Sequence, residues 1–206
     1  AMTDAQINKA IREDLFEDAY ATQQKERIPY RGKNLALGME STVFACPACG
    51  KIGALHSDPS RLYCDCGWEA VYDVYGELTD KLGKVYTITQ LDMLQRRRLM
   101  EYVASCNEEA ELFSDSVTWY VIDEHHNVIK TENGILAAYN DRLECLGRVI
   151  PYGEIQGMAI FSRNFLILHI QGEEGHIEIK ADKMFCALKY LYLYHEINDQ
   201  NTKEEV

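Results

Sequence analysis

The chain has 206 residues, of which 47% are hydrophobic and 26% are charged, and its formal net charge is −12. This length suits one sizeable domain or a few small ones. The acidic balance argues against nonspecific binding to nucleic acid or to anionic lipid, because both favour a basic surface. No apolar run is long enough to cross a bilayer, and the N-terminal segment is too polar for a signal peptide.

The first segment, residues 3–27, is predicted to form one helix. Thr3 followed by Gln6 fits a capping box, in which each residue's side chain bonds to the backbone of the other. Ile7, Ile11 and Leu15 recur every four residues and form one apolar stripe on an otherwise charged helix. Such a stripe needs a partner surface, either in this chain or outside it. We assign residues 1–40 to this helical segment.

Four cysteines form two close pairs, Cys46/Cys49 and Cys64/Cys66, separated by fourteen residues. In each pair a tight turn followed by glycine directs two sulfur atoms toward one point. Four thiolates favour Zn²⁺ in a closed tetrahedral site. The sequence therefore predicts that these four cysteines bind zinc, with His56 as an alternative to one of them.

The predicted zinc is structural, because a catalytic zinc needs an open coordination position and a site closed by four cysteines has none. Its surroundings carry too few apolar residues for an independent core, so the metal would let a small ribbon fold. We place this ribbon at residues 41–80, with a turn at 58–60 and strands at 42–45, 53–57, 61–63 and 68–74.

A second helix is predicted at residues 89–106, within a linking segment at 81–113. It contains the only basic run of the chain, residues 96–98, which we interpret as a solvated helix face. The isolated cysteines Cys106, Cys145 and Cys186 are interpreted as small core residues. The seven cysteines together do not resemble a disulfide framework, because four cluster at metal spacing and three stand alone, which favours a reducing, cytoplasmic location.

Residues 114–206 change to a β pattern followed by a C-terminal helix at 181–198. The helix carries Met184, Leu188, Leu191 and His195 on one line, which we expect to face the core. The element order resembles a pleckstrin-homology-like barrel, and residues 148–155 resemble the start of a mid-domain strand in bacterial members. The predicted fold class is α+β, with seven antiparallel strands at 117–123, 126–131, 134–139, 142–147, 155–162, 165–171 and 175–180.

The sequence contains no credible catalytic constellation. His125 and His126 fall in a predicted turn, whereas His169 and His176 lie on successive strands and could face each other. We interpret all four as surface or half-buried positions. Neither a phosphate-binding loop nor a nucleophile elbow occurs. We therefore predict no catalytic residues, and substrate-binding residues remain unassigned.

Residues 15–80 resemble a segment that follows the catalytic domain in some bacterial 1-acyl-glycerol-3-phosphate acyltransferases. The likeness covers about a third of the chain. The barrel region adds only its general fold analogy. The matching residues are Asp18-Ala19-Tyr20, Gln23, the run IPYRGKN at 28–34, Ala36, Glu40, both cysteine pairs, Leu55-His56-Ser57 and Gly67.

The resemblance implies a role in phospholipid biosynthesis, but not catalysis by this chain. The family's signature is a His, four residues and an Asp, which together activate the acceptor hydroxyl. None of the six histidines is followed by an Asp at that spacing. We therefore expect a non-catalytic accessory or regulatory region, at the cytosolic face of the membrane. Its partner would be a missing N-terminal catalytic domain, which alone would provide membrane association.

Two other interpretations remain open. The chain could be a stand-alone zinc-ribbon adaptor that binds proteins. A nucleic-acid-binding ribbon is disfavoured, because residues 41–80 carry two basic and six acidic side chains. The acidic turn at 123–127 likewise disfavours phosphoinositide binding and leaves protein or peptide ligands for the barrel.

Overall fold

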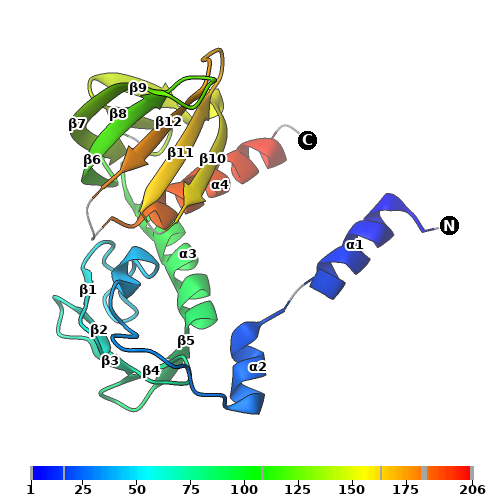
Figure 1. The fold of residues 1–206 in the computed structure, drawn as a ribbon, viewed down its shortest axis with the longest axis vertical. Helices are drawn as coiled ribbons and strands as arrows, with labels where there is room; N and C mark the ends of the chain where they lie inside the picture. The colour runs from blue at the N-terminus through cyan, green and yellow to red at the C-terminus, as the bar shows by residue number, and fades with distance from the viewer. Residues whose placement is uncertain (1, 16, 108, 163, 182–184, 205–206) are drawn as a thin grey trace.

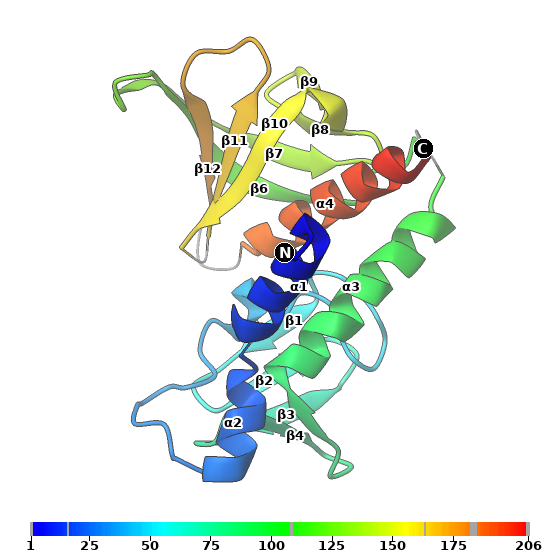
Figure 2. The ribbon, with the colours of Figure 1, turned by 90° about the vertical axis from the view of Figure 1, so that its right-hand side faces the viewer.

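The computed structural model describes residues 2–15, 17–107, 109–162, 164–181 and 185–204, the last six by their backbone alone. Within these residues the fold is mixed α and β, with two antiparallel sheets (Figure 1). A five-stranded sheet lies at one end of the molecule and a seven-stranded, curled sheet at the other. One long helix runs alongside both (Figure 2).

The N-terminal segment forms two helices, α1 (Asp4–Leu15) and α2 (Ala19–Glu26), so the prediction of a single helix was wrong. Asp18 caps a second helix, since its Oδ1 accepts hydrogen bonds from the backbone N–H of Tyr20 at 3.0 Å and Ala21 at 3.3 Å. The capping box at Thr3 and Gln6 is confirmed. Helix α1 projects away from both sheets (Figure 1).

The five-stranded sheet follows a short 3₁₀ helix, η1 (Met39–Ser41), and its strands pair in sequence order. The predicted strand at 42–45 contributes only an isolated bridge between Ala45 and Ile52. Two further strands lie beyond the predicted ones, so the expected boundary at residue 80 falls inside this sheet. The strands are β1 (Leu55–Ser57), β2 (Arg61–Cys64), β3 (Glu69–Tyr72), β4 (Glu77–Asp80) and β5 (Val85–Thr87).

Helix α3 (Ile88–Ser105) leads from this sheet to the next and begins with a capping box between Thr87 and Gln90. The side chain of Gln95 on α3 is buried, and it bonds to the backbone of residues 42–44, where a neighbouring strand would otherwise pair. Its Oε1 accepts from the Phe44 N–H at 3.0 Å, and its Nε2 donates to the Thr42 carbonyl at 3.2 Å. The chain before the first cysteine pair is thus bonded to a helix instead of to a sheet.

The second sheet has the order β10-β11-β12-β6-β7-β8-β9 and curls into a half-barrel over α4 (Figure 2). It has seven strands, but two differ from prediction: β7 is continuous through the expected turn at 132–134, and β9 is additional. The strands are β6 (Phe113–Ile122), β7 (Val128–Ala138), β8 (Arg142–Cys145), β9 (Arg148–Pro151), β10 (Ile155–Phe161), β11 (Phe165–Ile170) and β12 (His176–Lys180).

The final helix, α4 (Ala187–Glu204), buries a different face from the predicted one. Tyr190 and Leu193 are fully buried, whereas His195 is exposed. Met184 lies outside the described residues. Tyrosine can occupy this face because the Tyr190 hydroxyl donates to Asp115 Oδ2 at 2.7 Å. The Tyr194 hydroxyl donates to the Ile155 carbonyl, next to the short 3₁₀ helix η2 (Tyr152–Glu154).

Two hydrophobic cores meet near Phe44. The larger core fills the curled sheet and α4, and it also includes Phe44 and Leu99. The ring of Phe44 meets Tyr192 of α4 edge to face, with the centroids 6.1 Å apart. The Tyr192 hydroxyl in turn donates to Asp92 of α3 at 2.6 Å. These contacts join helices α3 and α4 to each other and to the segment before the first cysteine pair. None of the described helices combines the length and apolar character needed to cross a membrane.

Candidate metal centre

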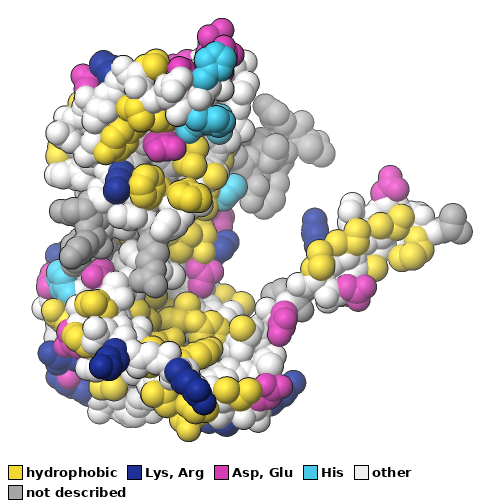
Figure 3. All heavy atoms as spheres, viewed as in Figure 1, with side chains coloured by type: hydrophobic (Ala, Val, Ile, Leu, Met, Phe, Trp, Pro, Cys, Tyr) yellow, Lys and Arg dark blue, Asp and Glu magenta, His cyan; other side chains and the backbone are white. Residues whose placement is uncertain are grey.

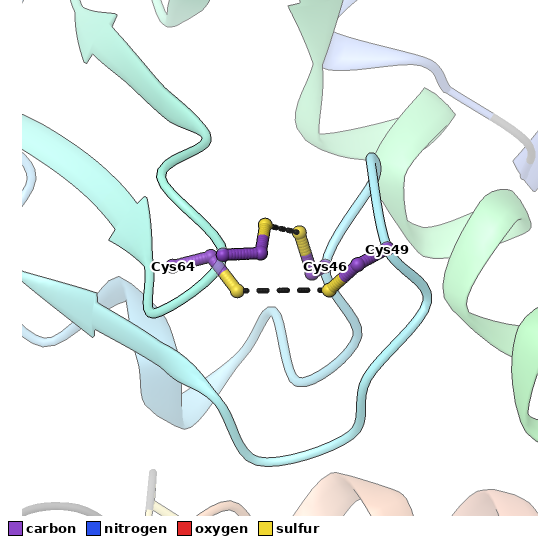
Figure 4. A group of neighbouring side chains, drawn as sticks. Cys46, Cys49 and Cys64 are labelled. Atoms are coloured by element: carbon purple, nitrogen blue, oxygen red, sulfur yellow. Dashed lines mark hydrogen bonds between the residues drawn. The ribbon is translucent and has the colours of Figure 1, made fainter.

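Two turns bring the four predicted ligands together. In the first, the Gly50 N–H donates to the Cys46 carbonyl, and Gly50 has a φ of +74° that favours glycine. In the second, the Gly67 N–H donates to the Cys64 carbonyl, and Gly67 has a φ of +92°. The shorter spacing between the second pair therefore still closes a turn. Figure 4 shows Cys46 and Cys49 on one loop, with the sulfur of Cys49 facing that of Cys64.

The sulfur positions fit a tetrahedral metal. All four Sγ atoms lie within 4.8 Å of one another. The Sγ atoms of Cys46 and Cys66 are 3.8 Å apart, and so are those of Cys49 and Cys64. Four sulfurs bound tetrahedrally at about 2.3 Å from an ion are separated by about 3.8 Å. The four thiols can thus converge on one ion with little movement.

The thiols differ in environment. Cys46 and Cys64 are buried, and burial raises the pKa of both thiols. Cys66 is exposed, and a hydrogen bond from the Trp68 backbone N–H lowers its pKa to about 7. Without a metal, two protonated thiols would occupy the interior of a small sheet. A bound divalent ion deprotonates its thiols and offsets the charge that burial disfavours.

His56, the alternative ligand, lies outside this group of four. Its Nε2 is 3.0 Å from Asp65 Oδ1, and its ring lies 5.6 Å from that of Tyr63. His56 therefore packs beside the second cysteine pair without joining it. Among the described residues, the four cysteines are the one group of His, Cys, Asp and Glu whose ligand atoms converge closely enough for a metal.

Four of the other histidines, at 125, 126, 169 and 176, lie on the curled sheet or its turns, and Figure 3 shows histidine side chains exposed at that end of the molecule. The rings of His169 and His176 lie 5.5 Å apart, as their predicted strands allow. His126, which sequence reasoning left in an isolated turn, lies 6.1 Å from His176. His126 comes close to His176 only through the pairing register of three strands. No local spacing in the sequence could therefore have indicated this proximity. Their ring nitrogens do not converge as the four sulfurs do.

The basic run on α3 is paired with acidic side chains. Arg96 lies 3.1 Å from Asp92, Arg98 lies 3.0 Å from Glu101, and Arg97 lies 3.6 Å from the same glutamate. The Arg96 guanidinium also covers the ring of Tyr192 at 3.8 Å. Two acidic side chains thus serve three arginines, because Arg97 and Arg98 share Glu101. Of the three isolated cysteines, Cys145 and Cys186 are buried and Cys106 is half-buried.

Comparison with known proteins does not assign the chain to a family. No protein-family model matches it, and no curated protein matches it. The functional inference therefore depends on the residues themselves and their arrangement.

Proposed function

We propose that Cys46, Cys49, Cys64 and Cys66 hold one structural Zn²⁺. The spacing of the sulfur atoms carries this proposal, since two pairs at 3.8 Å match the edge of a zinc–thiolate tetrahedron. Four sulfur ligands favour zinc over magnesium or calcium, which prefer oxygen. Four ligands also complete the coordination of zinc, so the ion would stabilise the fold and bind no substrate.

Metal analysis tests the identity of the ion. The protein purified without added metal should contain about one zinc per chain, as four-thiolate sites bind zinc tightly. Replacing the zinc with Co²⁺ should give the strong visible absorption of tetrahedral cobalt–thiolate. Iron in place of zinc, or an octahedral cobalt spectrum, would contradict the assignment.

We further propose that the chain is a non-catalytic accessory region of a glycerophospholipid acyltransferase. The resemblance of residues 15–80 to the segment that follows that catalytic domain supports this role. The absence of the His-x4-Asp signature from all 206 residues makes catalysis by this chain itself unsupported. The seven antiparallel strands and final helix favour the pleckstrin-homology-like assignment of the second region.

Helix α1 supplies a surface for the catalytic partner. All residues of Asp4–Leu15 are described, and none is buried. The stripe of Ile7, Ile11 and Leu15 is 42%, 48% and 79% exposed. An apolar stripe held in water on a projecting helix is typical of a surface that another domain covers. In an acyltransferase, the catalytic domain would precede this helix and cover its stripe.

The coding sequence upstream of Met2 tests this role directly, because the proposal requires a His-x4-Asp domain there. A second test joins that domain to the chain and replaces Ile7, Ile11 and Leu15 with serine. These three substitutions should make the segment between the catalytic domain and α1 accessible to protease. Serine at Lys9 and Glu13, on the charged face of α1, should not have this effect. An upstream sequence that lacks the catalytic signature would leave the adaptor interpretation in its place.

Nucleic-acid binding has little support from the described surface. The ribbon carries a net charge of −4 over residues 41–80, and the three consecutive arginines of α3 each have an acidic partner. Phosphate binding needs several unpaired cations on one face. A gel shift that strengthens as salt is lowered would restore this interpretation.

A further inference from the structure

The segment that follows α2 is exposed along its whole length. All residues at 24–34 are exposed, and they include Ile28 and Tyr30, whose exposed fractions are 59% and 43%. Figure 2 shows the chain leaving the end of α2 that lies farthest from the curled sheet and then following the outer edge of the five-stranded region. A large surface that approaches this part of the molecule can therefore contact these side chains directly.

Hydrogen bonds fix the backbone of this exposed segment. The buried Gln23 side chain bonds to both backbone groups of Ile28, since its Oε1 accepts from the N–H at 3.3 Å and its Nε2 donates to the carbonyl. The Tyr30 N–H donates to the Val74 carbonyl at 2.7 Å. The backbone is thus held in place although no described part of the chain covers it. A partner would not have to order this segment on binding.

The hydrogen bond to Val74 also brings apolar side chains together. Val74 follows β3 and is 42% exposed, and its carbonyl is bonded to Tyr30. Ile28 and Tyr30 flank Pro29, which is also exposed. Single exposed apolar side chains are ordinary, whereas a group of them marks a site of interaction. We call this group and its neighbouring cations the loop surface: Lys25, Ile28, Pro29, Tyr30, Arg31, Lys33 and Val74.

The loop surface is positive although the whole chain is acidic. Residues 25–33 carry four basic side chains and one acidic side chain. Arg27 is paired with Glu77 at 2.9 Å, whereas Lys25, Arg31 and Lys33 form no ion pair with any described carboxylate. Three unpaired cations beside exposed apolar side chains favour a partner that is both anionic and apolar.

An anionic lipid bilayer meets both requirements. Its headgroups carry negative charge, and the boundary between headgroups and acyl chains accepts apolar side chains. Tyrosine is enriched at this boundary, because its ring is apolar and its hydroxyl is polar. Lysine and arginine can extend their long side chains to reach phosphate. Nucleic acid would also pair with the cations, but it would gain little from an exposed isoleucine and valine.

We propose that the loop surface docks on membranes that contain anionic phospholipid. Ile28 and Val74 enter the headgroup region, and Arg31 and Lys33 pair with lipid phosphates. The net charge of −12 opposes this contact only weakly, because physiological salt screens charges beyond about 8 Å. The resemblance assigns membrane association to the catalytic domain alone, whereas this contact belongs to the present chain. It does not depend on the proposed accessory role.

Co-sedimentation of the full chain with lipid vesicles tests the proposal. The chain should bind phosphatidylcholine vesicles that contain about 30% phosphatidylglycerol at least tenfold more tightly than vesicles of phosphatidylcholine alone, because each cation near an anionic surface contributes about fivefold. Raising the salt concentration should weaken this binding. The comparison uses the unaltered protein and so does not depend on a variant folding.

Two substitutions separate the apolar contribution from the charged one. Ile28→Ser should weaken binding to the anionic vesicles about tenfold, and Arg31→Gln should weaken it about fivefold. Both side chains are exposed, and the backbone bonds of Ile28 remain, so the fold should persist. Val128→Ser and Lys180→Gln alter exposed residues of the curled sheet and should change binding by less than about twofold.

The proposal is overturned if the chain binds neither kind of vesicle, if it binds both equally, or if Ile28→Ser and Arg31→Gln bind like the unaltered chain. Loss of binding in Ile11→Ser with full binding in Ile28→Ser would assign the membrane contact to α1 and overturn it as well. A chain that ignores vesicles but binds polyglutamate or a DNA duplex through Arg31 would assign the cations to an acidic protein or to nucleic acid instead.

Discussion

The two sheets achieve stability in different ways. The curled sheet and α4 enclose a large apolar core, in which Leu136, Leu166 and Ile179 are fully buried. The five-stranded sheet has a smaller core, and two of its buried members, Cys46 and Cys64, are proposed metal ligands. Apolar area can stabilise the first region alone. A region as small as the second usually needs a metal or another cross-link.

The comparison indicates that one chain can combine a region that folds by apolar burial with a second region whose small core would need the proposed metal. The two are not independent, because Gln95 and Tyr192 connect them through Phe44 and Asp92. Loss of metal should therefore destabilise the five-stranded sheet first. The contacts of that sheet with the curled-sheet region should weaken only afterwards. Substitutions that affect one region and spare the other can separate these effects.

The largest expected effect is that of removing a ligand. Cys46→Ser should release most of the bound zinc and unfold the five-stranded sheet, at a cost of more than about 5 kcal/mol to that region. Amide signals of β1 to β5 should collapse, whereas those of β6 to β12 should persist. NMR with zinc quantification measures both. Cys106→Ser is the matched control, and loss of both sheets together would contradict the separation.

Gln95→Leu should have the next largest effect. It would leave the Phe44 N–H and the Thr42 carbonyl without their partner, at a cost of about 2 to 3 kcal/mol. Because Phe44 lies two residues before Cys46, zinc should also be released faster to a chelator. The exposed Gln156→Leu provides the comparison. Equal release rates in the two variants would show that Gln95 does not support the metal region.

Tyr190→Phe should act on the curled sheet alone. It removes hydrogen bonds to Asp115 at 2.7 Å and to the Leu136 carbonyl at 3.1 Å, and should destabilise this region by about 1 to 2 kcal/mol. Denaturant unfolding measures the change, and zinc content should stay the same. Tyr120→Phe, on β6, has no such bond among the described residues and should change stability by less than about 0.5 kcal/mol.

The smallest effect concerns pH and the turn between β6 and β7. Hydrogen bonds from Asn127, with its backbone N–H as the largest cause, hold the pKa of Asp123 below its ordinary value. Because the folded-state pKa is depressed, the carboxylate stabilises the fold above about pH 4 and this contribution disappears as the pH falls further. The stability difference between the unaltered chain and Asp123→Ala should therefore narrow on acidification. If the stability difference between the two proteins instead widens as the pH falls, the pKa of Asp123 is not lowered by folding.

Local chemistry predicted the parts of the fold that depend on few residues. The capping box at Thr3 and the turn at Asp58, whose Oδ1 accepts from the N–H groups of Ser60 and Arg61, both form as expected. The four cysteines meet because two short turns are sufficient to direct them. In each case the information lies within a few neighbouring positions.

Tertiary contacts decided the parts that the sequence pattern misplaced. Asn133-Gly134 has the composition of a turn, yet it pairs with β6 in the middle of a long strand. An added Cβ at Gly134 would lie 2.6 Å from a side-chain carbon of Leu146, so this glycine permits close approach instead of a turn. The buried face of α4 was likewise decided by hydroxyl partners such as Asp115 and Ile155, which lie far away in the sequence.

The interval between Phe44 and Cys46 has a geometric consequence. Phe44 belongs to the core of the curled sheet, whereas Cys46 belongs to that of the five-stranded sheet. Two residues of extended chain span at most about 7 Å. An ion that fixes the sulfur of Cys46 therefore also limits where the ring of Phe44 can point. A metal bound at Cys46 would therefore limit the angle between the two halves of the molecule, in addition to stabilising the five-stranded sheet.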